Sequence, residues 1–346
     1  MLSTTYINVI KHLQVETTTY CNSFCPGCSR NIDGGEVNPH IGLEHMSMET
    51  WTKLFENDSI SALTLNGTFG DTMMNPNIVE MLNEVANTGH ITDMVSLHTN
   101  GGLRSQDYWR DLATVLKRFK NHEVVFSIDG LIDTNHIHRR GTDFNKIIDN
   151  AKAFILAGGT ASWRMIVFDH NKHQIEEAKQ FAKELGFRYF MVKSSYDKIM
   201  YAKKYKNMPE ATITAPDNNV YKKLKELQED FYPEREGVHF WANENKSKEF
   251  TNTFNCPWLN DLALQVDVKG RIWPCCYISD NANNTFYDNE WSISSINENF
   301  PQDFNNINKF NLIEILSHKF FTEHLNNVWE NKESQICENC MNKEII

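Results

Sequence analysis

The stretch Cys21-Asn-Ser-Phe-Cys25-Pro-Gly-Cys28 gathers three of the eight cysteines of this chain into one short segment. The other five come much later, at Cys256, Cys275, Cys276, Cys337 and Cys340. Disulfide frameworks are typical of small secreted proteins, whereas this chain has 346 residues and opens without the basic start, apolar core and cleavage site of an export signal. Clustered thiols in such a chain indicate a metal site that holds zinc or an iron–sulfur cluster.

The number of cysteines in the first group limits the kind of metal site. A structural zinc ion is closed by four ligands in a tetrahedron, and this group supplies three. Either a distant fourth ligand completes the set, or one coordination position is left open. An open position is what a metal centre needs if a reactant is to bind to it.

The composition of the chain is that of an acidic globular protein. It has 34 Lys and Arg against 45 Asp and Glu, a formal net charge of −11, and 40% hydrophobic residues. Net negative charge disfavours binding to a phosphate backbone, so we expect no nucleic-acid partner. No apolar run approaches the roughly 20 residues of a membrane span, so we expect no membrane partner and a cytoplasmic protein.

Alternating strand and helix patterns over residues 1–195 predict repeated βα units around a parallel sheet. The predicted strands are residues 12–16, 62–66, 94–98, 124–128, 162–168 and 187–192. The predicted helices are residues 47–56, 77–86, 105–119, 144–157 and 172–185, with left-handed caps expected at Gly158 and Gly186. Units of this kind predict an α/β fold, an open or partial barrel.

The rest of the chain divides into a connector and a smaller extension. Residues 196–250 are rich in Lys, Glu, Asn and Pro, and one amphipathic helix is predicted there from apolar residues at helical spacing, namely Val220, Leu224, Leu227 and Phe231. Residues 251–346 hold the later cysteines, a hairpin with its turn at Lys269 and Gly270, and a final helix over residues 311–330. We therefore expect three parts, residues 1–195, 196–250 and 251–346.

The three-then-two cysteine spacing, directly after the first predicted strand, resembles that of the radical S-adenosylmethionine (radical SAM) superfamily. The resemblance implies a partial (β/α)6 TIM-like barrel, in which Cys21, Cys25 and Cys28 bind three irons of a 4Fe–4S cluster. It also implies that the fourth iron binds S-adenosylmethionine. An electron from the reduced cluster then cleaves the cofactor, and a 5′-deoxyadenosyl radical abstracts a hydrogen atom from the substrate.

Further segments resemble the cofactor-binding motifs of that superfamily in the expected order. The resemblance implies that S-adenosylmethionine is contacted by Gly70, Asp71, Asn100, Ser127, Asp129, Arg139 and Arg164, with Arg140 as an alternative to Arg139. Two positions depart from the family pattern: Phe69-Gly70-Asp71 replaces the usual Gly-Gly-Glu, and Gly27 replaces the aromatic residue that often precedes the third cysteine. His136 and His138 are expected to be surface residues rather than metal ligands.

The later cysteines resemble the auxiliary-cluster extension of radical SAM enzymes, called SPASM with two clusters and twitch with one. The resemblance implies an α+β extension with one auxiliary 4Fe–4S cluster, bound by Cys256, Cys275, Cys337 and Cys340. The resemblance favours Cys275 over Cys276, because Cys275 follows Gly270 at the spacing of that family. A zinc ribbon remains an alternative for this half, because Cys-x-x-Cys serves both metals.

The resemblance implies an enzyme that takes electrons from a donor such as flavodoxin or ferredoxin. Its substrate is expected to be a peptide or protein. The alternative is a small molecule, such as an aminocyclitol or a sugar-like alcohol, that is dehydrogenated by the same radical chemistry. A hypothesis of another class is a non-catalytic scaffold in which both cysteine groups bind zinc.

Overall fold

The structure, a computed structural model, contains one nine-stranded sheet. It describes residues 10–32, 34–56, 60–194, 229–231, 256, 258, 261–283, 291–331, 334 and 337. The strands are β1 (His12–Val15), β2 (Ile60–Leu65), β3 (Ile91–Thr99), β4 (Asn121–Ser127), β5 (Ala161–Val167), β6 (Tyr189–Ser194), β7 (Glu229–Asp230), β8 (Ala263–Val266) and β9 (Ile272–Trp273). Their order in the sheet is β7-β6-β5-β4-β3-β2-β1-β8-β9.

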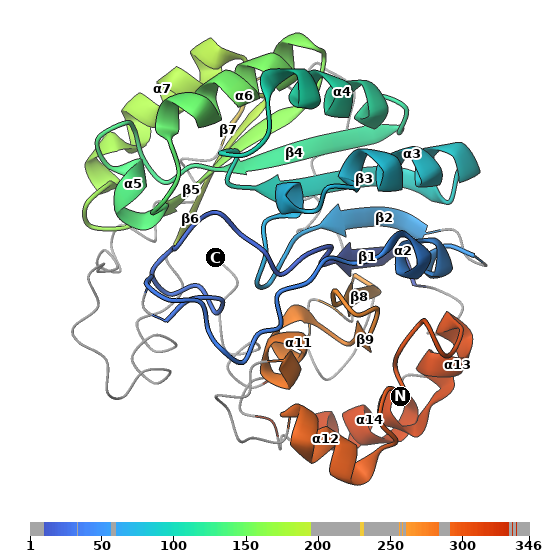
Figure 1. The fold of residues 1–346 in the computed structure, drawn as a ribbon. Helices are drawn as coiled ribbons and strands as arrows, with labels where there is room; N and C mark the ends of the chain where they lie inside the picture. Colours follow the sequence, from blue (N-terminus) through green and yellow to red (C-terminus); the bar gives the residue numbers. More distant parts are fainter. Residues whose placement is uncertain are drawn as a thin grey trace.

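Strands β1 to β6 lie side by side in chain order and are all parallel. The helices that connect them are α2 (Met48–Leu54), α3 (Ile78–Thr88), α4 (Gln106–Leu116), α5 (Asn135–His138), α6 (Phe144–Leu156) and α7 (Ile175–Leu185), with short turns η1 (Thr72–Met74) and η2 (Lys172–Gln174). Helices α3, α4, α6 and α7 line one side of the sheet (Figure 1). The predicted α/β fold with a parallel sheet is confirmed.

Local sequence explains where the helices begin and end. Ser47, Ser105 and Asp143 each accept a backbone hydrogen bond in the first turn of α2, α4 and α6, which satisfies donors that a helix start leaves open. Gly158 and Gly186 follow α6 and α7 with φ of +89° and +87°. These are the left-handed conformations that the sequence predicts for helix ends at glycine.

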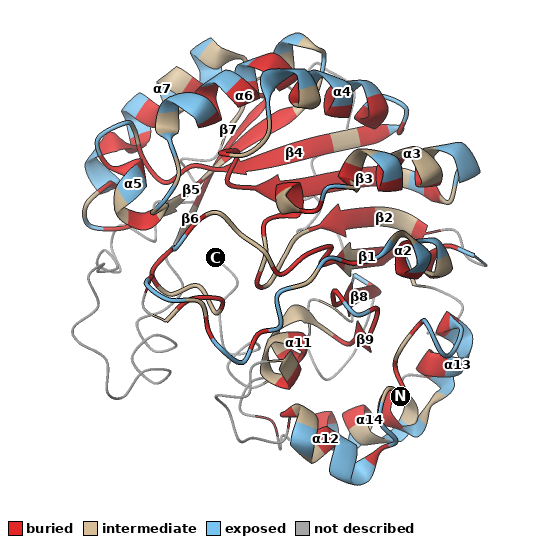
Figure 2. Ribbon diagram, in the orientation of Figure 1, coloured by how far each residue is buried: buried red, intermediate tan, exposed pale blue. Residues whose placement is uncertain are grey.

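The two faces of the barrel strands differ in polarity. Leu13 and Leu63 are register neighbours on β1 and β2, and both belong to the hydrophobic core together with Trp51 of α2. Gln14 and Thr64, the next register pair, are polar and point to the opposite face, because side chains alternate along a strand. Figure 2 shows this burial on the strands and the exposed outer sides of the helices.

The later part of the chain adds two strands to the edge of the barrel sheet. Strand β8 pairs with β1 in parallel, and β9 pairs with β8 antiparallel, which confirms the predicted hairpin. Gly270 lies in its turn with φ of +79°. The helices that follow are α11 (Cys276–Asn283), α12 (Ile293–Asn299), α13 (Leu312–Ser317) and α14 (Leu325–Glu330), with a π-helical turn η5 (Phe320–His324) before α14.

One helix prediction is wrong, and a second lies mostly outside the described residues. The single helix expected over residues 311–330 is wrong, because the chain is extended at His318 (ψ 145°). The rings of His318 and Phe304 stack with centroids 4.5 Å apart. His318 Nδ1 also accepts a hydrogen bond from the N–H of Phe320, at the start of the next helical segment. In the connector, Val220, Leu224 and Leu227 lie outside the described residues, and Phe231 follows strand β7 rather than ending a helix.

Within the described part of the chain, the helices are all too short or too polar to cross a lipid bilayer.

Candidate functional site

The loop after β1 carries the first cysteine group. Pro26 and Gly27 form a turn in which the N–H of Cys28 donates to the carbonyl oxygen of Cys25 at 3.2 Å. Gly27 has φ of +76°, a conformation that glycine adopts without strain and an aromatic residue does not. This turn is a structural reason for glycine at the position before Cys28.

Burial raises the pKa of the Cys21 thiol to about 12, with further contributions from the nearby Asp71, Cys28 and Cys25. Burial and these neighbouring charges disfavour the ionised form of Cys21, so a cation bound at its sulfur would stabilise the thiolate. Among the described residues, no three His, Cys, Asp or Glu side chains converge as a site for a single metal ion. A multi-iron cluster, in which each thiolate binds a different iron, fits three separate thiols.

Hydrogen-bond donors surround the sulfur atoms of this loop. Asn100 Nδ2 lies 3.8 Å from Cys21 Sγ, and the backbone N–H of Ser23 donates to the same sulfur at 3.4 Å. An Arg139 guanidinium nitrogen lies 3.9 Å from Cys25 Sγ. N–H groups directed at thiolates are what an iron–sulfur cluster needs in its surroundings. The side chains present therefore fit the cluster that the sequence predicts.

The Phe69-Gly70-Asp71 segment packs against the backbone of the cysteine loop. The N–H of Asp71 donates to the carbonyl oxygen of Tyr20 at 2.9 Å. A Cβ atom at Gly70 would lie 1.8 Å from the carbonyl oxygen of Thr18, so only glycine fits. The Asp71 carboxylate accepts hydrogen bonds from the N–H groups of Asn100 (2.7 Å) and Met73 (3.0 Å). Asp71 thus joins the loops after β2 and β3, and its contact with the cofactor stays a prediction.

Three further predicted residues lie on or directly after three neighbouring strands. Asn100 follows β3, Ser127 ends β4, and Arg164 of β5 is the register partner of Ser127. An Arg164 guanidinium nitrogen donates to Ser127 Oγ at 3.1 Å, and Arg164 is partly exposed. The carboxyl ends of barrel strands are where active sites of such folds are built. The fold therefore places these predicted cofactor contacts on one rim.

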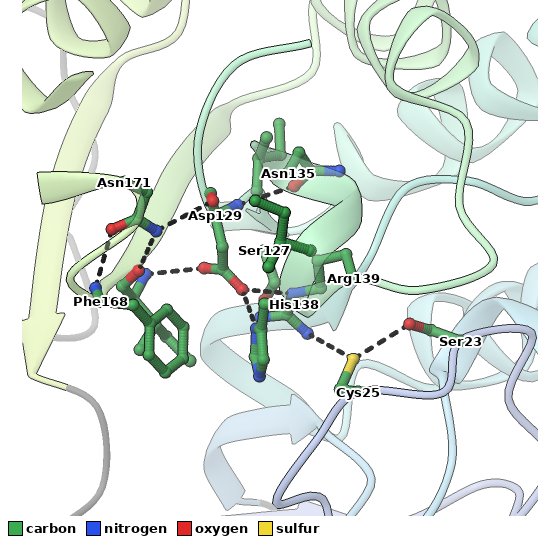
Figure 3. Close-up of polar contacts among 12 residues, drawn as sticks. Ser23, Cys25, Ser127, Asp129, Asn135, His138, Arg139, Phe168 and Asn171 are labelled. Carbon is green, nitrogen blue, oxygen red and sulfur yellow. Dashed lines mark hydrogen bonds and ion pairs between the residues drawn. The ribbon is translucent and has the colours of Figure 1, made fainter. Parts of the chain in front are cut away.

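Asp129 and Arg139 form a buried ion pair beside the same rim (Figure 3). Asp129 Oδ2 accepts from Arg139 Nε and lies 2.6 Å from both this atom and His138 Nδ1. Burial alone would raise the pKa of Asp129, but Arg139 and His138 hold it well below its ordinary value. Both carboxylate oxygens have partners within the chain, since Asp129 Oδ1 accepts from the N–H of Ile166. A direct contact between Asp129 and the cofactor stays a prediction.

His138 differs from its predicted place. His136 is exposed as expected, whereas His138 is 5% exposed and packs against Phe168 with ring centroids 4.6 Å apart. The prediction that both histidines lie on the surface is therefore wrong for His138. The position of His138 depends on its contacts with the Asp129 carboxylate and with the ring of Phe168 after β5, a distant partner that local sequence does not reveal.

Glu16 is a site residue that the sequence analysis did not single out. It follows β1, is 1% exposed, and accepts hydrogen bonds from the N–H groups of Phe69 (2.6 Å) and Gly70 (3.1 Å). Burial raises its pKa to about 8, and the nearby Asp267 and Asp280 add to the effect. An acidic residue at the carboxyl end of a strand that precedes the cysteine loop was the available signal.

The later cysteines approach each other in the extension. Burial raises the pKa of the Cys275 thiol, and nearby Cys276, Cys256 and Cys337 raise it further. Cys256, Cys275 and Cys337 are all partly buried against the hydrophobic core. Cys340 lies outside the described residues. The fold thus brings three of the four predicted auxiliary ligands into one region together with Cys276, and the choice between Cys275 and Cys276 stays a prediction.

A comparison with protein families finds one match. Residues 15–182 match the family described as the radical SAM superfamily. Members of this family use a 4Fe–4S cluster and S-adenosylmethionine. No curated protein sequence matches the chain.

Solved structures of radical SAM enzymes share the fold over most of the chain. Native anSMEcpe with bound AdoMet has a TM-score of 0.59 at 17% identity, over 90% of this chain and 82% of that chain. The structure of anSMEcpe with AdoMet and the Cp18Cys peptide has a TM-score of 0.59 at 17% identity, over 95% and 87%. Streptococcus suis SuiB bound to precursor peptide SuiA has a TM-score of 0.52 at 16% identity, over 80% and 62%. At identities this low, the structural similarity shows a shared fold and nothing more.

Replacing Glu16 by Gln should remove a pH dependence from folding stability. The pKa of Glu16 is raised from 4.5 to about 8, so between these values the folded protein holds a proton that the unfolded chain releases. The stability contributed by this proton is complete below pH 4.5 and is lost as the pH rises through 8. The loss is up to about 1.4 kcal/mol per pH unit. Gln keeps the oxygen that accepts from Phe69 and Gly70.

Urea unfolding of both proteins at about pH 6 and 8.5 measures this effect. The free energy of unfolding of Glu16→Gln should rise relative to that of the unmodified protein at the higher pH. Glu80→Gln, an exposed change on α3, is the matched control and should show no such trend. A Glu16→Gln difference that is the same at both pH values would contradict the assignment.

Proposed function

We propose that this protein is a radical SAM enzyme that cleaves S-adenosylmethionine reductively and modifies a peptide or protein substrate. The observation that carries the proposal is the position of Cys21, Cys25 and Cys28. The three thiols lie in one loop beside the strand ends, with Asn100 and Arg139 donors at two of the sulfurs. This is an arrangement for an electron-accepting cluster next to a cofactor site.

Each part of the rim has a separate task in this proposal. The three thiolates would hold the cluster, and the chemistry that it would supply is reductive cleavage of bound S-adenosylmethionine to a hydrogen-abstracting 5′-deoxyadenosyl radical. Arg164 and Ser127 orient the cofactor from β5 and β4, with Arg164 as the cation for its carboxylate. Gly70 keeps the loop after β2 close to the cysteine loop. Positioning of this kind is the contribution that the protein makes to cofactor chemistry.

A peptide or protein is the proposed substrate class. The support comes from the shared fold: anSMEcpe has been solved with a bound Cp18Cys peptide, and SuiB with precursor peptide SuiA. We further propose that Cys256, Cys275, Cys337 and Cys340 bind one auxiliary 4Fe–4S cluster in residues 251–346. The raised pKa of Cys275, caused by burial and three nearby thiols, supports a group that neutralises these sulfurs. A cytoplasmic location and a low-potential electron donor such as flavodoxin or ferredoxin complete the proposal.

The Cys28→Ala variant tests the first cluster. Reduced protein, reconstituted anaerobically with iron and sulfide and mixed with S-adenosylmethionine, should release 5′-deoxyadenosine, because three thiolates leave one iron open to the cofactor. Cys28→Ala should abolish this release, as measured by chromatography. Cys276→Ala is the control and should retain it. Release unchanged in Cys28→Ala would show that the loop is misassigned, and two zinc ions without sulfide in the purified protein would favour the scaffold hypothesis.

The Cys337→Ala variant tests the auxiliary cluster. Loss of one ligand should lower iron and sulfide content by about half, while release of 5′-deoxyadenosine falls less than product formation, because the first cluster is intact. Iron and sulfide analysis with the same chromatographic assay measures both effects. An iron content equal to that of the unmodified protein would contradict a ligand role for Cys337.

Stimulation of cofactor cleavage tests the substrate class. A bound substrate would give a hydrogen atom to the 5′-deoxyadenosyl radical, which leaves 5′-deoxyadenosine and a substrate radical. Turnover of S-adenosylmethionine should therefore increase severalfold with a mixture of short synthetic peptides. An aminocyclitol mixture at equal concentration is the matched comparison. Stimulation by the aminocyclitols and none by the peptides would replace the peptide proposal with small-molecule dehydrogenation.

A further inference from the structure

The chain segment after α5 holds the cysteine loop at several points. The carbonyl oxygen of Arg140 accepts from the N–H of Phe24 at 2.9 Å and from Ser23 Oγ at 3.0 Å. His138 bonds to the backbone of Pro26, and Arg139 reaches Cys25 Sγ at 3.9 Å. Three consecutive residues, His138–Arg140, thus contact four consecutive residues of the loop. We name this segment the clamp.

The clamp is fixed to the barrel through one carboxylate. Asp129, which is 0% exposed, binds both His138 and Arg139 through Oδ2. Its remaining groups are also engaged: Oδ1 accepts from the N–H of Ile166, and its own N–H donates to Asn135 Oδ1 at 2.9 Å. Figure 3 shows Arg139 between Asp129 and Cys25. Because the guanidinium is held on one side by a rigid anion, its position at the sulfur is set by the fold.

A cation at one ligand sulfur acts on the two oxidation states of a cluster unequally. The reduced state carries one more negative charge, so a charged N–H donor stabilises it more than the oxidised state. Arg139 is mostly buried (side chain 14% exposed), so water screens this interaction little. The consequence is a higher midpoint potential for the one-electron couple of the cluster.

We propose that Arg139 is a positioning residue that raises the reduction potential of the cluster bound by Cys21, Cys25 and Cys28, and that Asp129 holds it in place. The proposal rests on the proposed function, since it requires a cluster in this loop. It goes further because it assigns to the Arg139 side chain a redox role through Cys25, where the sequence predicts a contact with the cofactor carboxylate.

The midpoint potential of the reconstituted full-length protein tests this role. In an EPR-monitored redox titration without cofactor, Arg139→Gln should lower the equilibrium constant for one-electron reduction roughly tenfold, a shift of about 59 mV to more negative potential. The relevant signal is the one that changes on later addition of S-adenosylmethionine, which separates it from an auxiliary cluster. Arg139→Lys keeps the positive charge but not the planar guanidinium group, so its midpoint potential should shift less in the same direction.

Arg140→Gln is the matched control. It removes the same charge one residue away, where the guanidinium donates to backbone oxygens of Ile137 and Gly34 rather than to sulfur. The midpoint potential of the cluster in Arg140→Gln should match that in the unmodified protein.

Three results would overturn the inference. The first is an unchanged potential in Arg139→Gln at equal iron content. The second is an equal shift in Arg140→Gln, which would indicate a general charge effect. The third result applies if the Arg139→Gln variant fails to bind iron. In that case, a midpoint potential of Arg139→Lys equal to that of the unmodified protein would contradict the inference. Absence of any cluster in the unmodified protein would instead refute the proposed function, so the two failures are distinguishable.

Discussion

The rest of the site depends on the buried ion pair between Asp129 and Arg139. A charged carboxylate in the protein interior is strongly unfavourable unless it is paired and hydrogen-bonded, and Asp129 meets this condition with partners from the clamp and β5. The same partners position the backbone that binds the cysteine loop. One electrostatic requirement therefore sets the geometry of Cys25 relative to the strand ends, and removal of either partner would leave a buried charge uncompensated.

A second set of contacts joins the two cysteine groups. The extension continues the barrel sheet, since β8 pairs with β1, the strand that leads directly into the cysteine loop. Ser29, next to Cys28, donates to Asp280 of α11 at 3.1 Å, and α11 begins at Cys276. Glu16 lies between these parts and is affected by the charges of Asp267 and Asp280. The spacing between the two groups is thus fixed by strand pairing and a direct hydrogen bond.

The sequence predicts those features that local physics determines. Apolar periodicity, serine and aspartate caps and the glycines at 158 and 186 mark β1 to β6 and the helices between them. Asn100, Ser127 and Arg164 are also predictable as neighbours, because parallel strands bring their carboxyl ends to one edge. The roles of Glu16 and His138 are not predictable in this way. Glu16 depends on the N–H groups of Phe69 and Gly70, and His138 depends on Phe168 and on the buried charge of Asp129. The break at His318 was missed because ring stacking on Phe304 overrides helical spacing.

The Phe69-Gly70-Asp71 segment is held in place by contacts within the chain. Gly70 is required by the carbonyl oxygen of Thr18, independent of any cofactor. Phe69 is 3% exposed, so its side chain fills protein interior, and its N–H is bound by Glu16. The Asp71 carboxylate accepts a hydrogen bond from the N–H of Asn100, which connects the loop after β2 to the loop after β3. The backbone of this segment is therefore held by the Glu16 carboxylate, while its own acidic residue, Asp71, is engaged within the chain.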